Sequence, residues 1–197
     1  TLSNKGYIKR LNQAEFTAQK RGGRGVQGTG VKDDDFVKEL VSTSTHDRLL
    51  FFTNKGRVYR LKGYEIPEYG RTAKGLPVVN LLKLEEGETI QTIINVQQDR
   101  SDDSYLFFTT RHGVVKRTSV TEFANIRQNG LKALNLKDED ELINVFLTDG
   151  AADVIIGTKF GYSVRFNETA VRSMSRIATG VRGVNLRDGD QVVGAGV

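Results

Sequence analysis

Short apolar runs separated by turns rich in glycine and charge form the main pattern of this chain. Clear runs occur at residues 49–53, 105–109 and 154–158, and each is followed by a glycine turn and a second β-rich segment. A strand, a tight turn and another strand form a β-hairpin. No long stretch has the period of about 3.6 residues that marks an amphipathic helix, so the pattern predicts an all-β protein.

The hairpins recur four times. A first glycine marks each turn and an arginine follows it by four residues; the glycines are Gly6, Gly56, Gly113 and Gly161, and the arginines are Arg10, Arg60, Arg117 and Arg165. A second glycine comes 17 to 19 residues after the first, and an acidic turn follows it. Four units of about 50 residues, each with about four strand-like segments, are typical of a propeller-like array of small sheets. We expect a single domain over residues 1–197, with blades at approximately 1–47, 48–103, 104–152 and 153–197.

The first unit differs from the others at its start. Residues 1–3 provide only the end of the strand that residues 49–53 provide in full in the second unit. We therefore expect the first blade to lack a strand, which either preceding residues or another blade must supply.

Composition narrows the function classes. Apolar residues make up 38% of the chain and charged residues 27%, as in ordinary globular domains. There is no cysteine, which excludes disulfides and thiolate zinc sites. The longest apolar runs, 49–52 and 145–147, are far too short to span a membrane. No nucleotide-binding phosphate loop or catalytic triad context is present, so neither a cofactor nor a metal is expected.

Positive charge is concentrated near the start. Residues 1–32 contain seven Lys or Arg and one acidic residue, a net +6, so the remaining residues sum to −1 of the total +5. Such a patch indicates a defined anionic partner. Its most distinctive part is a basic glycine loop made of Gln19, Lys20, Arg21, Gly22, Gly23, Arg24 and Gly25. Glycines let the backbone and the guanidinium groups approach a polyanion closely.

The other three units have an arginine at the position equivalent to Arg21, with a further cation nearby. These residues are Arg71 and Lys74, Arg127 and Lys132, and Arg176 and Arg182. Repeated units place equivalent positions at equivalent places. We therefore expect an arc of cations along one edge, suited to the phosphates of a bent DNA duplex. Because no base-reading helix or aromatic platform is evident, sequence-specific readout is not expected.

The loop and the repeats together resemble the C-terminal domain of bacterial DNA gyrase A. The sequence Gln-Lys-Arg-Gly-Gly-Arg-Gly is similar to that family's signature box, Gln-Arg-Arg-Gly-Gly-Lys-Gly, with one basic residue exchanged for another at Lys20 and Arg24. The related domain of topoisomerase IV has the same repeats but a degraded box. The intact box therefore favours gyrase.

This resemblance implies both a fold and a function. The fold would be a β-pinwheel, a propeller-like disc of six blades that swap strands with their neighbours, of which the four repeats here form a part. The missing initiator methionine also indicates a piece of a longer chain. The domain would be a non-catalytic, cytoplasmic module that wraps duplex DNA on a basic rim. Gyrase A and gyrase B, assembled in one heterotetramer, would then introduce negative supercoils with ATP.

Other interpretations stay open on the residues alone. The array could be a propeller that binds an acidic protein, or the equivalent domain of topoisomerase IV. The arginines four residues after the first glycines could contact DNA or pair with a carboxylate of the next blade. The acidic turns are most simply solvated loops. His46 and His112 have no partner motif.

Overall fold

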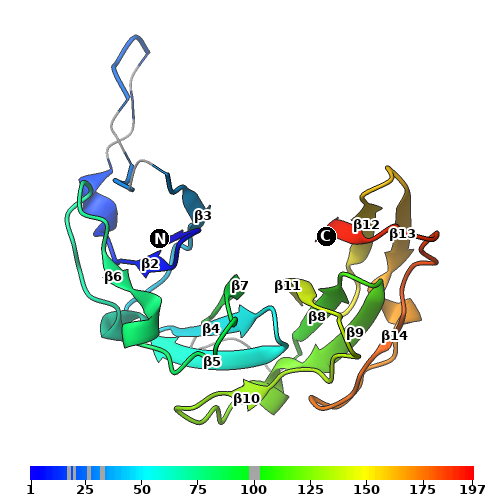
Figure 1. Cartoon of the computed structure of the whole chain (residues 1–197). Helices are drawn as coiled ribbons and strands as arrows, with labels where there is room; N and C mark the ends of the chain where they lie inside the picture. The colour runs from blue at the N-terminus through cyan, green and yellow to red at the C-terminus, as the bar shows by residue number, and fades with distance from the viewer. Residues whose placement is uncertain (17–18, 20, 26–27, 32–33, 98–102) are drawn as a thin grey trace.

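Four small sheets stand side by side along an open arc (Figure 1). The computed structural model describes residues 1–16, 19, 21–25, 28–31, 34–97 and 103–197. Over these residues the chain is all-β, as predicted, with 15 short strands and five single-turn 3-10 helices. The first and last sheets face each other across the open side of the arc.

Each sheet is antiparallel and small. The first has the spatial order β3 (Val37–Glu39), β1 (Leu2–Ser3), β2 (Tyr7–Ile8), β6 (Leu76–Pro77). The second is β10 (Leu131–Lys132), β5 (Arg57–Lys62), β4 (Arg48–Thr53), β7 (Ile90–Val96). The third is β11 (Leu142–Thr148), β8 (Tyr105–Thr110), β9 (Val114–Ser119), β14 (Val181–Arg182). The fourth is β13 (Ser163–Asn167), β12 (Asp153–Thr158), β15 (Val192–Gly196).

Neighbouring repeats exchange strands. The outer strand of each of the first three sheets comes from the following repeat: β6 pairs with β2, β10 with β5 and β14 with β9. These three strands lie on the outer side of the arc, whereas β7 and β11 lie on its inner side (Figure 1). A sheet is therefore built from two repeats, and its edge ties one repeat to the next.

The expectation that the first blade lacks a strand is wrong. Residues 2–3 form β1, which is only two residues long but pairs with both β2 and β3, so the first sheet has four strands. Thr1, which precedes β1, lines a cavity of about 810 Å³ together with apolar residues of the first two sheets, among them Ile8, Leu49 and Phe51. Among the described residues it is the fourth sheet that has three strands, because no outer strand pairs with β13.

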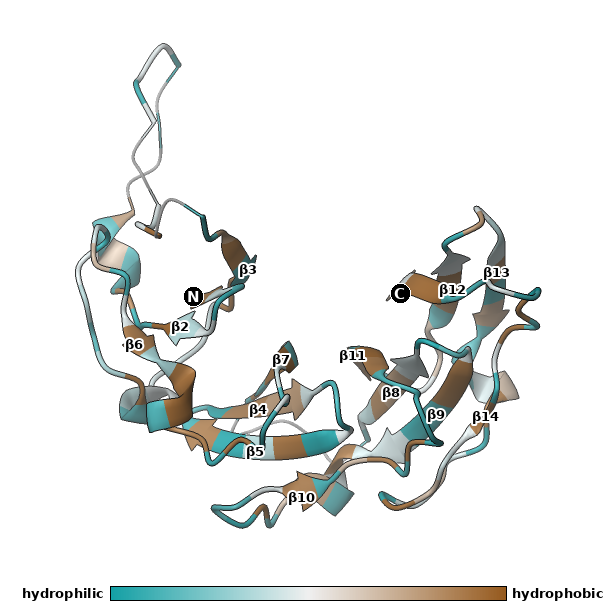
Figure 2. Cartoon of the chain, in the orientation of Figure 1, coloured by the Kyte–Doolittle hydropathy of each residue, from teal (hydrophilic) through white to brown (hydrophobic). Residues whose placement is uncertain are grey.

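The hydrophobic core lies between the sheets rather than in one centre. Phe51 belongs to a cluster shared with the first sheet, whereas its neighbour Phe52 packs towards the third sheet. Phe108 meets Phe52 edge to face, with ring centroids 5.5 Å apart, and Phe107 turns towards the fourth sheet. Successive residues of a strand point to opposite faces. Two buried faces explain why these strands are continuous apolar runs, which Figure 2 shows as brown segments within strands.

The acidic turns are not simply solvated loops. In three repeats one aspartate of the turn accepts a backbone N–H bond from the hairpin turn of the same repeat and a second one from the residue that follows the aspartate. Asp140 accepts from His112 and Glu141, Asp190 from Phe160 and Gln191, and Asp35 from Lys5 and Phe36. The second repeat has Glu88 instead, and its longer side chain is buried against Tyr59 and Thr53.

The helical content is limited to single turns. They are η1 (Gln13–Glu15), η2 (Gly63–Glu65), η3 (Val78–Asn80), η4 (Val120–Phe123) and η5 (Glu168–Ala170). In the described part of the chain, no helix is long and apolar enough to cross a membrane.

Candidate nucleic-acid interface

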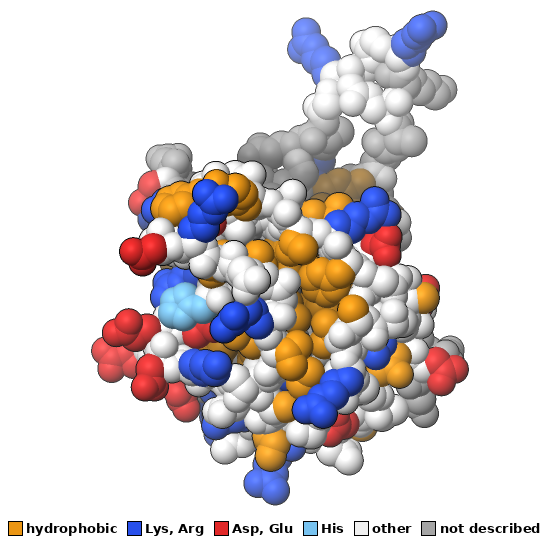
Figure 3. Space-filling model, turned by 90° about the vertical axis from the view of Figure 1, so that its right-hand side faces the viewer, with side chains coloured by type: hydrophobic (Ala, Val, Ile, Leu, Met, Phe, Trp, Pro, Cys, Tyr) orange, Lys and Arg blue, Asp and Glu red, His pale blue; other side chains and the backbone are white. Residues whose placement is uncertain are grey.

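The basic glycine loop stands clear of the sheets. It extends away from the first sheet in Figure 1, and its basic side chains project from the body of the molecule in Figure 3. Gln19 and residues 21–25 are all exposed, and the Gln19 side-chain amide donates to the Gly23 carbonyl across the loop. Neither Arg21 nor Arg24 has a hydrogen-bond or ion-pair partner among the described residues. Lys20 lies outside the described residues.

The equivalent loops of the other repeats share one location. Residues 69–74, 125–129 and 174–179 each lead into an outer strand, namely β6, β10 and β14. Strand exchange therefore sets each loop against the sheet of the preceding repeat. Arg71, in the first of these loops, is half-buried with its Nε 3.9 Å from Glu15. Lys74 is exposed and its Nζ lies over the Tyr7 ring, 5.2 Å from the centroid.

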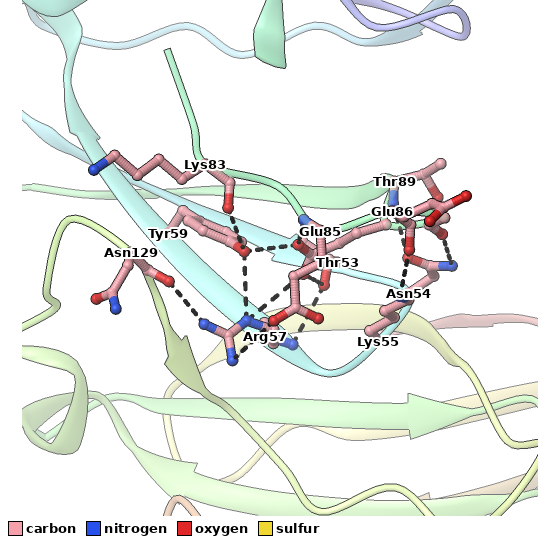
Figure 4. A network of polar contacts seen from close by, with 12 residues as sticks. Thr53, Asn54, Lys55, Arg57, Tyr59, Lys83, Glu85, Glu86, Thr89 and Asn129 are labelled. Atoms are coloured by element: carbon pink, nitrogen blue, oxygen red, sulfur yellow. Dashed lines mark hydrogen bonds and ion pairs between the residues drawn. The ribbon is translucent and has the colours of Figure 1, made fainter. Parts of the chain in front are cut away.

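A partly buried polar network holds the loop that contains Arg127 (Figure 4). The Arg57 guanidinium donates to the Asn129 carbonyl at 2.7 Å and to the Tyr59 hydroxyl. That hydroxyl donates to Glu88 at 2.6 Å, and burial together with this carboxylate raises the pKa of Tyr59 to about 12. Arg127 itself is exposed, with no hydrogen-bond or ion-pair partner among the residues described.

Two candidate cations meet at the boundary between the second and third sheets. Arg176 Nη1 donates to the Lys132 carbonyl at 3.1 Å, so a loop of the fourth repeat touches β10 of the second sheet. Lys132 is exposed and Arg176 half-buried. Arg182, on β14, is exposed and donates to the Asn185 side chain.

Sequence reasoning missed two lysines beneath these loops. Lys9 and Lys116 each follow a first glycine by three residues and are almost fully buried. The Lys9 Nζ donates to backbone carbonyls of residues 70, 71 and 73, and the Lys116 Nζ donates to those of residues 133 and 176. The only sequence signal is a lysine at the same position of two repeats.

The arginines four residues after the first glycines differ in their surroundings: two contact other parts of the array, one pairs within its own sheet and one is exposed. Arg10 donates to the Ile66 carbonyl and lies 3.6 Å from Glu68. Arg117 is mostly buried, 3.9 Å from Glu168 and over the Tyr105 ring. Both therefore stabilise contacts within the array. Arg165 pairs with Asp153 on the neighbouring strand at 2.6 Å. Arg60 is exposed.

The described residues offer little to a metal. Within them, no group of three or more His, Asp or Glu side chains is arranged to hold an ion. The face on the side of the fourth sheet presents apolar side chains among charged ones (Figure 3), and exposed apolar residues of that sheet include Ile155 and Val193.

Comparison with known proteins gives consistent results. A family model described as "DNA gyrase C-terminal domain, beta-propeller" matches residues 1–44, 47–97, 104–149 and 152–197. DNA gyrase A of Streptococcus pneumoniae serotype 4 is 87% identical over 179 residues, which are 91% of this chain and 22% of the relative. The chain thus spans about a fifth of the length of such curated relatives.

Two solved structures share the fold over 98% of this chain. One is titled as the C-terminal domain of DNA gyrase A, with a TM-score of 0.74, 32% identity and 62% of that chain covered. The other is titled as the C-terminal domain of DNA topoisomerase IV, with a TM-score of 0.82, 30% identity and 58% of that chain covered.

Proposed function

Because this chain belongs to the family of DNA gyrase C-terminal domains with a β-propeller fold, we propose that it binds and bends duplex DNA without reading its sequence. The proposed contact surface is the outer side of the arc. It comprises the basic glycine loop 19–25 and the three equivalent loops with their neighbouring cations.

One observation carries this proposal. Strand exchange sets the loops of Arg71, Arg127 and Arg176 at the same place on three successive sheets, immediately before an outer strand. A curved series of cations can contact the phosphates at successive points along a bent duplex. The exposed Arg21 and Arg24 extend the series beyond the first sheet.

The chemistry of these groups predicts how binding behaves. Arginine and lysine side chains recognise phosphates through charge, and their contact releases condensed counterions. If about ten phosphates are contacted, the log–log dependence of affinity on salt has a slope of roughly −9. Backbone contacts position a protein on DNA but do not distinguish sequences.

The proposal extends to the parent protein. As a part of gyrase A, the module would present wrapped DNA to the cleavage core in a complex with gyrase B. The ATP-driven enzyme would thereby introduce negative supercoils into bacterial DNA in the cytoplasm. In this scheme the module has no catalytic residue and needs no cofactor, and its contribution is the path that it imposes on the duplex.

The decisive experiment measures binding and bending together. Affinity for several unrelated linear duplexes is measured at a series of salt concentrations, and bending is followed by energy transfer between dyes at the DNA ends. We expect similar affinities for all sequences and a steep salt dependence. The double substitution Arg21→Ala and Arg24→Ala should lower the salt slope by about two. It should abolish bending while some binding remains.

A matched control removes the same charge elsewhere. Lys83 and Lys137 are exposed and lie outside the candidate loops. The double substitution Lys83→Ala and Lys137→Ala should leave bending unchanged. Bending that survives the loss of Arg21 and Arg24 would refute the role of the loop. An unmodified chain that binds no duplex but captures an acidic protein would favour the protein-binding alternative.

A further inference from the structure

Lys116 is a buried cation with an unusual set of partners. Its side chain is inaccessible to solvent, and its Nζ lies 2.5 Å from both the Ala133 and the Arg176 carbonyl oxygens. The Nζ also lies over the Phe108 ring, 5.0 Å from the centroid. No ion pair involves this ammonium among the described residues. One carbonyl belongs to the third repeat and the other to the loop that carries Arg176, so the ammonium joins two repeats.

Lys9 makes the equivalent contact in the first repeat, two repeats before that of Lys116. It is 2% exposed, and its Nζ donates to the carbonyls of Gly70, Arg71 and Ala73 at 3.2, 2.8 and 2.5 Å. These residues form the loop that carries Arg71. Each lysine therefore donates a hydrogen bond to the backbone carbonyl of one candidate DNA-binding arginine, and each lysine belongs to the preceding repeat.

The second and fourth repeats have no lysine at this position. Tyr59 and Val164 occupy the position of the two lysines in the second and fourth repeats. The loop of Arg127 is held by the Arg57 guanidinium instead, through the Asn129 carbonyl. The lysine contacts are therefore not a general requirement of the hairpin. They are specific to the loops of Arg71 and Arg176.

Burial of an ammonium without a paired carboxylate opposes folding. Removing an ion from water costs several kcal/mol of free energy. Hydrogen bonds to carbonyl groups offset only part of that cost. Burial lowers the pKa of Lys116 to about 7, while the charge of Glu122 acts in the opposite direction. Apolar residues of similar volume would fill these sites at no such cost. The two buried ammonium groups are thus better explained by the loops that they hold in place than by a contribution to the stability of the fold.

We infer that Lys9 and Lys116 are positioning residues that fix the loops of Arg71 and Arg176 for contact with the DNA backbone. This inference rests on the proposed function, because it assigns to the two loops a place in the DNA-binding surface. A loop whose backbone carbonyls are already held does not lose conformational entropy when a phosphate binds. Its affinity for DNA is therefore higher than that of a mobile loop.

The test is a double-mutant cycle on DNA binding by the full chain. Lys116→Met removes the ammonium and keeps an unbranched apolar side chain that is one atom shorter, and Arg176→Ala removes the proposed contact. Each should weaken binding about fivefold, somewhat less than the tenfold that 1.4 kcal/mol represents, and should lower the salt slope by about one. Because Lys116 acts through Arg176, the double variant should bind like Arg176→Ala alone, with a slope lowered by one and not two.

Hydrogen exchange provides a readout that does not depend on DNA. The Ala178 amide donates to the Ser175 carbonyl within the loop. In Lys116→Met this amide should exchange faster, while the amides of β8 and β9 keep their protection. Lys62→Met is the matched control, because Lys62 is a partly exposed lysine outside the candidate loops. It removes one positive charge and should change neither the exchange nor the coupling with Arg176.

The outcomes separate the two proposals. An unmodified chain that binds no duplex would overturn the proposed function and, with it, the positioning role. Two outcomes would overturn the positioning role alone, provided that the unmodified chain binds duplex DNA. In the first, Lys116→Met binds as tightly as the unmodified chain. In the second, the effects of Lys116→Met and Arg176→Ala on affinity are additive. If Lys116→Met does not fold, the pair Lys9→Met and Arg71→Ala gives the same cycle with the same outcomes.

Discussion

At the scale of single residues, the second glycines of the second and fourth repeats are explained by a close approach between repeats. Gly75 has φ +91° and Gly180 has φ +102°, in the region that side chains disfavour. A Cβ at Gly75 would lie 2.5 Å from the Ile8 carbonyl oxygen, and one at Gly180 would collide with the Val115 carbonyl. Gly75 and Gly180 are thus the points where one repeat crosses the strand of the preceding one.

We predict that Gly180→Ala lowers the free energy of unfolding by about 3 kcal/mol, because it adds both backbone strain and a collision with Val115. Urea unfolding followed by circular dichroism measures this change. Gly194→Ala is the control, since a Cβ there meets nothing within 4 Å and no positive φ is involved. A loss at Gly180 no larger than at Gly194 would contradict the explanation.

Lys116 predicts a pH dependence of stability. Its pKa is lowered to about 7 in the folded chain from the ordinary value of 10.5, so between these values the unfolded chain binds more protons than the folded one. Stability therefore rises with pH in that window, by at most about 1.4 kcal/mol per pH unit from this group, and the contribution is constant below pH 7. In Lys116→Met this rise should be missing.

The measurement compares urea midpoints of the unmodified chain and Lys116→Met at several pH values between 7 and 9. Other titrating groups are common to both proteins and cancel in the difference. The stability of Lys116→Met relative to the unmodified chain should be greatest at the low end of the window. Parallel pH profiles would show that Lys116 titrates in the folded chain as it does in the unfolded one.

At the scale of elements, the sequence predicts the hairpins well and the connections between them poorly. The runs at 49–53, 105–109 and 154–158 lie within β4, β8 and β12, because a buried apolar run beside a glycine turn has few other solutions. The outer strands β6, β10 and β14 are two residues each, too short to show any alternation. Their pairing with the preceding repeat depends on contacts that no local pattern records.

The same limit applies to the candidate site. The repeated arginines at 71, 127 and 176 could be aligned from the sequence, because equivalent positions of repeats occupy equivalent places. Lys9 and Lys116 could not be identified as buried, since a lysine next to an arginine in a strand normally indicates a solvent-facing position. Their burial follows from strand exchange, which brings carbonyl groups of the following repeat over the strand.

At the scale of the whole molecule, stability is distributed along the arc. Each hydrophobic cluster lies between two consecutive sheets, and adjacent phenylalanines of one strand belong to different clusters. In arrays of this kind, stability is close to the sum of the units and their interfaces. The curvature offered to DNA is therefore set interface by interface, and weakening one interface should leave the sheets on either side folded.

Phe52 tests this description, because it is fully buried between the second and third sheets against Phe108 and Phe123. We predict that Phe52→Ala weakens that interface by about 3–5 kcal/mol and separates unfolding into two steps. Hydrogen exchange at increasing urea concentrations should then show the strands of the first two sheets and those of the last two sheets losing protection independently. Ile155→Ala, at a half-exposed position of the fourth sheet, should change stability by less than about 0.5 kcal/mol and keep one transition. If Phe52→Ala unfolds in a single transition at a lower urea concentration, the arc behaves as one cooperative unit, and its curvature cannot be adjusted at a single interface.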